Sequence, residues 1–210
     1  MFRHAALLLV ALVPFSSATD KYTKTATQSW DFEQGGKIEL HVRYGDVRIV
    51  PSNDSRISLS YTMHSQHASF MNKVEPDFHL LGSNATLALH APHDGSIDVE
   101  LRVPFRSDLF VRVSAGDVSV GPIEGSHDVE THAGDIAIGL LADQHYGPVD
   151  ASTHAGDVSA PFGEARGWIG NSLKYYGPGK FRIHAHTFAG DIDLKPTETA
   201  RVEDQSQHEE

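Results

Sequence analysis

A short phrase in which Gly-Asp precedes Val or Ile occurs five times in this 210-residue chain, and it constrains the fold more than any other feature. The glycine and aspartate pairs are Gly45 and Asp46, Gly116 and Asp117, Gly134 and Asp135, Gly156 and Asp157, and Gly190 and Asp191. The last four glycines are separated by 18, 22 and 34 residues. Self-similarity at intervals near 20 residues is typical of structural units that stack on one another.

Apolar or small residues alternate with polar residues on both sides of each Gly-Asp pair, and the alternation changes parity there. In the third copy, Val129 and Thr131 precede the pair at odd positions, whereas Ile136 and Ile138 follow it at even positions. Alternation of period two predicts half-buried strands, and a change of parity predicts a corner that re-aims the chain. Glycine adopts a positive φ without steric cost, and aspartate can bond nearby backbone. The sequence therefore predicts an all-β domain: a repeat-built β-solenoid, similar to a single-stranded β-helix, with Gly-Asp corners.

The same alternation predicts further strands, which together define a repeat domain over residues 30–195. These strands are expected at residues 37–42, 56–61, 85–89, 97–103, 109–113, 129–131, 149–153 and 181–187. Residues 64–77 have no clear period, so we expect them to be irregular.

Residues 163–180 lengthen the last interval between copies, and we expect them to form a loop insertion or a distorted coil on the flank of the domain. This segment contains Trp168, Tyr175 and Tyr176 among several glycines. Aromatic rings in such a setting can stack on sugar rings or contact a protein. We favour a cap over the open end of the core, because stacked strand units need an apolar lid against water.

The N-terminus has the order of a secretory signal peptide. A short basic start at residues 1–4 precedes an apolar run at 5–15 and the small residues Ser-Ser-Ala at 16–18. We expect residues 1–18 to be removed and the product to be exported to the periplasm or the cell surface, with no stable membrane span afterwards. At the other end, residues 196–210 contain almost no apolar residues and several acids, which predicts a disordered acidic tail.

The composition excludes several kinds of partner and site. Lys and Arg total 17 against 28 Asp and Glu, a net charge of −11. A chain this acidic is repelled by nucleic-acid phosphates, so we expect no nucleic-acid partner. The chain has no cysteine, which excludes disulfides, thiolate zinc sites and a Cys nucleophile. Histidine, with 14 copies, is the unusual residue type.

Three segments resemble the bacterial putative-adhesin family. They are Ile-Asp-Val-Glu-Leu-Arg-Val-Pro at 97–104, Leu-Phe-Val-Arg-Val-Ser-Ala-Gly-Asp-Val-Ser-Val at 109–120, and Val-Glu-Thr-His-Ala-Gly-Asp-Ile-Ala-Ile at 129–138. The resemblance covers roughly residues 30–195. It implies an all-β, solenoid-like fold of Gly-Asp-Ile/Val strand repeats in an exported or cell-envelope protein. The family is a domain of unknown function and brings no catalytic residues to transfer.

The outward-facing histidines form a candidate metal site with two interpretations. His132 and His154 both stand two residues before the glycine of their copy, and Phe188 is equivalent in the last copy. If successive units stack at the strand spacing of about 4.8 Å, the two imidazoles are neighbours. Together with Glu130 they form a candidate site for Zn²⁺, Ni²⁺ or Cu²⁺. Further ligand types occupy outward positions nearby: Asp128, Asp150, His184 and His186. We favour an exposed ladder of ordinary polar residues, because a metal site usually needs three converging ligands.

The corner aspartates have two interpretations. Stacked carboxylates offer oxygen ligands to Ca²⁺, but calcium-binding β-rolls use several Gly and Asp in each turn, whereas each unit here has one pair. We therefore expect structural corners in which aspartate bonds the backbone.

Catalytic motifs are missing from the sequence. It contains no Gly-x-Ser-x-Gly, His-Glu-x-x-His or phosphate-binding Gly-x-x-x-x-Gly-Lys. We expect no enzyme activity and no cofactor. The predicted function is a non-enzymatic binding or scaffold module of the cell envelope, adhesin-like, with a protein or glycan ligand that the sequence does not identify. The alternatives are a secreted divalent-metal-binding protein that uses the outward histidines and, less favoured, a β-helix enzyme acting on glycans.

Overall fold

The computed structural model describes residues 9–11, 22–70, 75–91, 95–163, 167 and 170–197. The strands of this part are β1 (Leu9–Ala11), β2 (Tyr22–Asp31), β3 (Gly36–Tyr44), β4 (Val47–Ser52), β5 (Arg56–Ser65), β6 (Asp77–Leu81), β7 (Asn84–Leu89), β8 (Gly95–Pro104), β9 (Ser107–Ala115), β10 (Val118–Val120), β11 (His127–Ala133), β12 (Ile136–Leu140), β13 (Tyr146–Ala155), β14 (Val158–Ser159), β15 (Asn171–Tyr176), β16 (Phe181–Ala189) and β17 (Ile192–Pro196). Two 3-10 turns, η1 (Ala68–Phe70) and η2 (Asp143–His145), are the helical elements of these residues.

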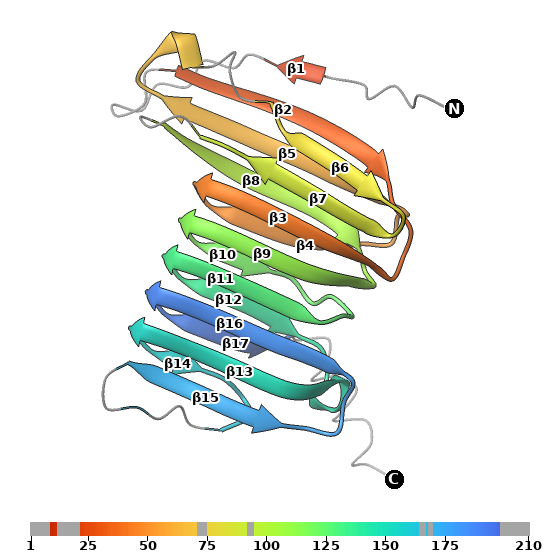
Figure 1. The fold of residues 1–210 in the computed structure, drawn as a ribbon, viewed down its shortest axis with the longest axis vertical. Helices are drawn as coiled ribbons and strands as arrows, with labels where there is room; N and C mark the ends of the chain where they lie inside the picture. Colours follow the sequence, from red (N-terminus) through yellow and green to blue (C-terminus); the bar gives the residue numbers. More distant parts are fainter. Residues whose placement is uncertain are drawn as a thin grey trace.

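The strands form two mixed sheets that face each other (Figure 1). Sheet A has the order β1-β2-β5-β8-β4-β10-β12-β17-β14, and sheet B has the order β15-β13-β16-β11-β9-β3-β7-β6. One continuous apolar core lies between them. The all-β prediction is confirmed, whereas the finer description as a solenoid or single-stranded β-helix stays a prediction.

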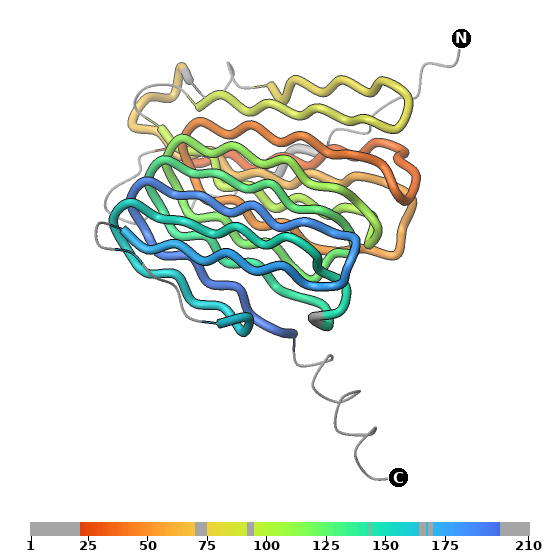
Figure 2. The backbone as a smooth tube through the Cα atoms, turned by 60° about the horizontal axis from the view of Figure 1, so that its bottom comes forward, coloured from red at the N-terminus to blue at the C-terminus, as the bar shows by residue number. Residues whose placement is uncertain are grey.

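Each Gly-Asp pair links a strand of sheet B to a strand of sheet A. The linked strands are β3 and β4, β9 and β10, β11 and β12, β13 and β14, and β16 and β17. We call each linked pair a Gly-Asp unit. Neighbouring units pair in parallel in both sheets, and Figure 2 shows their backbones following one another closely.

The order of the units in space differs from their order in the sequence. The last unit, β16 and β17, lies between β11/β12 and β13/β14. The expectation that successive units are neighbours is therefore wrong for the third and fourth units, β11/β12 and β13/β14, which the last unit separates. The chain from β12 to β13 skips one strand position, β15 then covers the free edge of β13 in antiparallel pairing, and β16 fills the vacant position.

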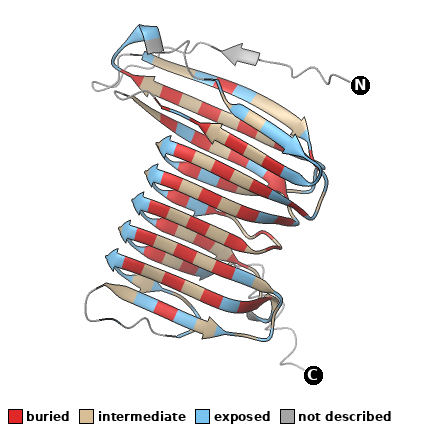
Figure 3. Ribbon diagram, in the orientation of Figure 1, coloured by how far each residue is buried: buried red, intermediate tan, exposed pale blue. Residues whose placement is uncertain are grey.

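The core follows directly from the alternation of residues. Figure 3 shows buried and more exposed residues alternating along the strands. Val118, Ile136, Ile192 and Val158 are consecutive partners across sheet A and form one inward row, with Val158 only partly buried at the edge. The predicted strands are all present, because two-residue periodicity and one buried face specify them together.

Besides β1, three strands have no counterpart in the predictions. Strand β2 begins before residue 30, β6 lies at the edge of sheet B, and β15 occupies part of the segment expected to be a loop or distorted coil. Both β6 and β15 are edge strands with little burial, so they show no clean alternation. The predicted signal peptide lies outside the described residues except for β1, which pairs with β2. Of the predicted tail, Pro196 ends β17, Thr197 bonds Leu140, and residues 198–210 lie outside the described part.

Aromatic rings cover both ends of the core. Tyr175 stacks on Phe162 with ring centroids 4.6 Å apart, and both rings pack on the core. This placement agrees with the predicted cap, although Tyr176 is 79% exposed and Trp168 lies outside the described residues. At the opposite end, Trp30 of β2 stacks on Phe78 of β6 at 4.1 Å, which joins the edges of the two sheets.

The corners bring backbone into close contact with backbone. The corner glycines have φ between 129° and 149°. A Cβ atom on Gly134 would lie 2.1 Å from the carbonyl oxygen of Gly116, and one on Gly190 would lie 2.2 Å from that of Gly134. Only glycine fits this position, because both the positive φ and the neighbouring carbonyl exclude a side chain.

We expect Gly134→Ala to destabilise the protein by on the order of 4 kcal/mol, more than backbone strain alone explains. Gly163 is the matched control, because it has the same φ of 139° and a Cβ at this position would have no atom of the described part of the chain within 4 Å. Gly163→Ala should cost only the strain, about 1–3 kcal/mol. Urea unfolding of both variants measures the difference. Equal losses would contradict the role of close backbone approach.

One inward position of sheet B carries a histidine where its neighbours carry Leu109 and Ile183. His127 is 1% exposed, and neither ring nitrogen has a hydrogen-bond partner among the described residues. Burial lowers the pKa of His127 to about 4, and the backbone of Ile123 and the charge of Asp108 offset this effect only in part. The imidazole is therefore neutral in the folded protein at pH 7.

His127 should make the protein sensitive to acid. Its folded pKa of about 4 lies below the ordinary 6.5, so its contribution to stability is complete above pH 6.5 and is lost as the pH falls towards 4. Between pH 7.5 and 4.5 this loss amounts to about 2–3 kcal/mol. We expect His127→Leu to remove that part of the pH dependence in urea unfolding at the two pH values. An unchanged pH dependence in His127→Leu would contradict the assignment.

Candidate functional site

The outer face of sheet B carries side chains in rows that run across the strands. Register places Glu39, Phe110, Asp128, His184 and Asp150 in one row. A second row contains His41, Arg112, Glu130, His186 and Ser152, and a third contains Ser114, His132, Phe188 and His154. Because parallel strands lie about 4.8 Å apart, side chains within a row contact their neighbours.

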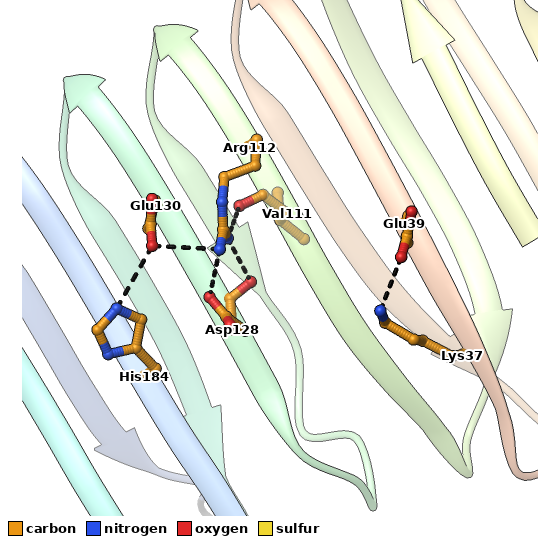
Figure 4. A network of polar contacts seen from close by, with 7 residues as sticks. All are labelled: Lys37, Glu39, Val111, Arg112, Asp128, Glu130 and His184. Carbon is orange, nitrogen blue, oxygen red and sulfur yellow. Dashed lines mark hydrogen bonds and ion pairs between the residues drawn. The ribbon is translucent and has the colours of Figure 1, made fainter.

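Arg112 is the centre of the polar contacts on this face (Figure 4). Its Nη2 lies 2.8 Å from Asp128 Oδ1 and 3.1 Å from Glu130 Oε1. Its Nη1 donates to the carbonyl oxygens of Val111 and Asp128 at 2.9 and 3.1 Å. The guanidinium also lies 3.6 Å from the centre of the Phe110 ring, a favourable cation–π distance. Two carboxylates, two carbonyls and one ring thus hold the cation in place.

His184 extends this network onto the next strand. Its Nε2 lies 3.4 Å from Glu130 Oε1. Suitable ligand atoms of Asp128, Glu130 and His184 all lie within 4.8 Å of one another. All three side chains are between 34% and 38% exposed, so solutes reach them.

The structure does not bring the predicted ligands His132, His154 and Glu130 together. Phe188 lies between the two imidazoles and stacks on both, with ring centroids 5.1 Å from His132 and 4.9 Å from His154. The cause is the position of β16 between β11 and β13, which puts Phe188 of β16 where the second histidine was expected. Glu130 instead contacts Arg112 and His184.

The corner aspartates form a hydrogen-bonded ladder along one edge of the units. Oδ1 of each aspartate accepts a hydrogen bond from the backbone N–H of the next: Asp46 from Asp117, Asp117 from Asp135, Asp135 from Asp191, and Asp191 from Asp157, at 2.7 to 3.0 Å. Asp98 and Asn171 continue the ladder at its two ends. The carboxylates thus bond the backbone, as the structural interpretation expects, but of the neighbouring unit.

The outer face of sheet A holds a shallow depression of about 590 Å³. Small side chains form its floor, including Ser119 and Ala137, and Asp46, Asp98 and Glu100 line it beside Arg48. On the other sheet, a second depression contains Asp128, Asp150, Lys174, Arg182 and His184. Both lie on outer faces rather than between the sheets.

Sequence reasoning placed Asp128 and His184 near the histidine face but did not identify Arg112 as the residue that joins them. Two signals were available: Arg112 alternates outward on its strand, and it stands opposite Glu130 once the two units are aligned on their glycines. The contact between Glu130 and His184 had no local signal, since it depends on β16 lying beside β11.

Comparison with known proteins adds evidence on the fold. No protein-family model and no curated protein matches the chain. The crystal structure of a putative cell adhesion protein from Clostridium sporogenes ATCC 15579 has a TM-score of 0.52 and 13% sequence identity, and the match covers 83% of this chain and 100% of that chain. At this identity the likeness shows a shared fold, and it supports the expected resemblance to putative adhesins at that level.

A putative adhesin from Parabacteroides merdae ATCC 43184 matches with a TM-score of 0.22 and 10% identity, over 82% of this chain and 94% of that one.

Neither 3-10 turn in the described residues is long enough to cross a bilayer.

The aspartate ladder predicts a specific cost for losing one carboxylate. We expect Asp135→Ala to destabilise the protein by about 1 kcal/mol, because the N–H of Asp191 loses its partner. Asp135→Asn keeps an oxygen acceptor and should cost less. Amide hydrogen exchange at Asp191 should accelerate in Asp135→Ala only. Exchange at Asp191 that is no faster in Asp135→Ala than in the unchanged protein would show that the carboxylate does not hold this amide.

Proposed function

We propose that the protein is an exported, non-enzymatic binding or scaffold module of the cell envelope, adhesin-like, whose contact surface is the outer face of sheet B. The observation that carries this proposal is the regular register of that face. The rows that contain Arg112, Glu130 and His184 run in register across five parallel strands, β3, β9, β11, β16 and β13. A flat, ordered and polar surface suits contact with an extended polymer or another protein surface.

The interior supports a binding role over a catalytic one. The apolar faces of the two sheets fill the space between them with buried side chains. The cluster of Arg112, Glu130 and His184 lies instead on an outer face, where its side chains are partly exposed to water. Among these residues, no nucleophile, base and orienting group converge in the manner that acyl transfer or hydrolysis requires.

We further propose that the Gly-Asp units are repeats of one solenoid-like structure. Support comes from the parallel pairing of neighbouring units in both sheets and from the aspartate ladder. Threonine hydroxyls repeat in the same way, since Thr131 and Thr187 each donate to the corner glycine carbonyl of the preceding unit. Stacking of such units extends a surface without changing its chemistry.

Export and an adhesin-like role have independent support. The order of residues 1–18 is that of a signal peptide. The described fold is shared with a protein described as a putative cell adhesion protein. A protein or glycan ligand outside the cytoplasm fits both observations.

Binding can be tested with two charge-matched variants. The first, His41→Glu with His186→Glu, changes the outer face of sheet B. The second, Ser60→Glu with Ser119→Glu, changes the outer face of sheet A and serves as the control. The probes are immobilised peptidoglycan, lipopolysaccharide and teichoic acid. We expect retention of the unchanged protein on one of them, loss in the sheet B variant and retention in the sheet A variant.

Two further measurements accompany this experiment. Release of reducing ends from the same polymers should stay at background, and turnover would favour the glycan-active enzyme instead. Cell fractionation with N-terminal sequencing should find the protein outside the cytoplasm with Thr19 as its first residue. Equal loss in both charge variants, or retention on none of the three probes, would contradict the proposed surface.

A further inference from the structure

Three metal-ligand types converge on the outer face of sheet B, from strands β11 and β16. They are the carboxylates of Asp128 and Glu130 and the imidazole of His184, with ligand atoms within 4.8 Å of one another. We propose that these three residues bind a divalent first-row transition ion, with Zn²⁺ as the reference ion. The set differs from the pair of corner histidines that the sequence suggests, and it shares only Glu130 with it.

The register of the sheet builds this set. Asp128 and His184 are direct partners in the parallel pairing of β11 and β16, and Glu130 lies two residues along β11 on the same outward face. On the far side of His184, Asp150 of β13 is its direct partner in the next pairing. Asp128, Asp150 and His184 line one depression, so Asp150 or water can complete the coordination.

The distances suit a tetrahedral ion. Bonds of about 2.0–2.1 Å at tetrahedral angles place neighbouring ligand atoms about 3.3 Å apart. Glu130 Oε1 and His184 Nε2 are 3.4 Å apart, which already matches one edge of such a tetrahedron. The side chains are partly exposed, so Asp128 Oδ1 can approach by rotation of its side chain.

The imidazole of His184 determines which kind of metal ion this set favours. Carboxylate and carbonyl oxygens alone favour Ca²⁺ or Mg²⁺, whereas an imidazole with carboxylates favours Zn²⁺ and its neighbours in the first transition row. Only neutral imidazole is a ligand, so binding competes with protons.

Arg112 is the resident cation that the ion must displace. Its Nη2 contacts Asp128 Oδ1 and Glu130 Oε1, the two oxygens that the ion needs. Partly exposed ion pairs of this kind contribute little to stability. The carbonyl of Val111 and the ring of Phe110 can hold the guanidinium when it leaves the carboxylates. Arg112 thus competes with the ion without belonging to its ligand set.

Zinc titration of the tag-free full-length chain by calorimetry at pH 7.5 tests the site. We expect one site per chain with a Kd of about 10 μM. His184→Ala and, separately, Glu130→Gln should each weaken binding at least about tenfold through loss of a ligand. Arg112→Ala should strengthen it, which a purely structural effect would not do. At pH 5.5 the affinity of the unchanged protein should be lower than at pH 7.5, because protons compete with zinc for the imidazole.

His154→Ala is the matched control, because it removes another exposed histidine of the same face that lies outside the set. Its affinity for zinc should equal that of the unchanged protein. Zinc binding that survives both His184→Ala and Glu130→Gln, or that disappears in His154→Ala, would overturn the assignment. So would the absence of saturation at about 1 mM zinc. Thermal melts identify a variant that fails to fold, and Glu130→Gln, which keeps the shape of the side chain, then decides alone.

Discussion

The close approach of backbone to backbone at the Gly-Asp corners is the constraint on which the rest of the structure depends. Each corner glycine lies against backbone of the neighbouring strand unit, at a distance that admits no side chain. This contact fixes the distance between adjacent units and their register at one point. The strands on both sides of the corner therefore pair in register with those of the neighbouring unit. The aspartate that follows adds a hydrogen bond to the next unit, so the corner is bonded as well as packed. Rows of outward side chains are a direct result of this common register.

The sequence contains most of the fold because the corner and the strands have local signals. A glycine at position 134, which has a positive φ in the structure, and the change of parity from Thr131 to Ile136 both lie within a window of a few residues. Strands β6 and β15 cannot be predicted in this way, because an edge strand with little buried surface needs no alternation of apolar and polar residues. His127 could have been recognised as a polar residue at an inward position, since it has the parity of Val129.

The candidate site shows where local reasoning ends. Parity correctly puts His132, His154, Glu130 and His184 outside the core, but it says nothing about which strand lies beside which. Phe188 separates the first two histidines, and Glu130 meets His184, for one reason: β16 pairs with both β11 and β13. That arrangement is a long-range property of the whole sheet, since the partners of β16 come from two earlier parts of the chain.

The position of β16 and β17 also has a consequence for how the chain is assembled. The unit of β16 and β17 lies between β11/β12 and β13/β14 in both sheets, so β13 and β14 pair with the units before them only through residues 181–196. In synthesis from the N-terminus, β11 and β13 are made before β16, so the position between them is a gap until β16 is made. Closing this gap joins segments distant in sequence, which is a slow kind of step in folding. The unit of β16 and β17 is therefore the pairing link between β13/β14 and the rest of both sheets.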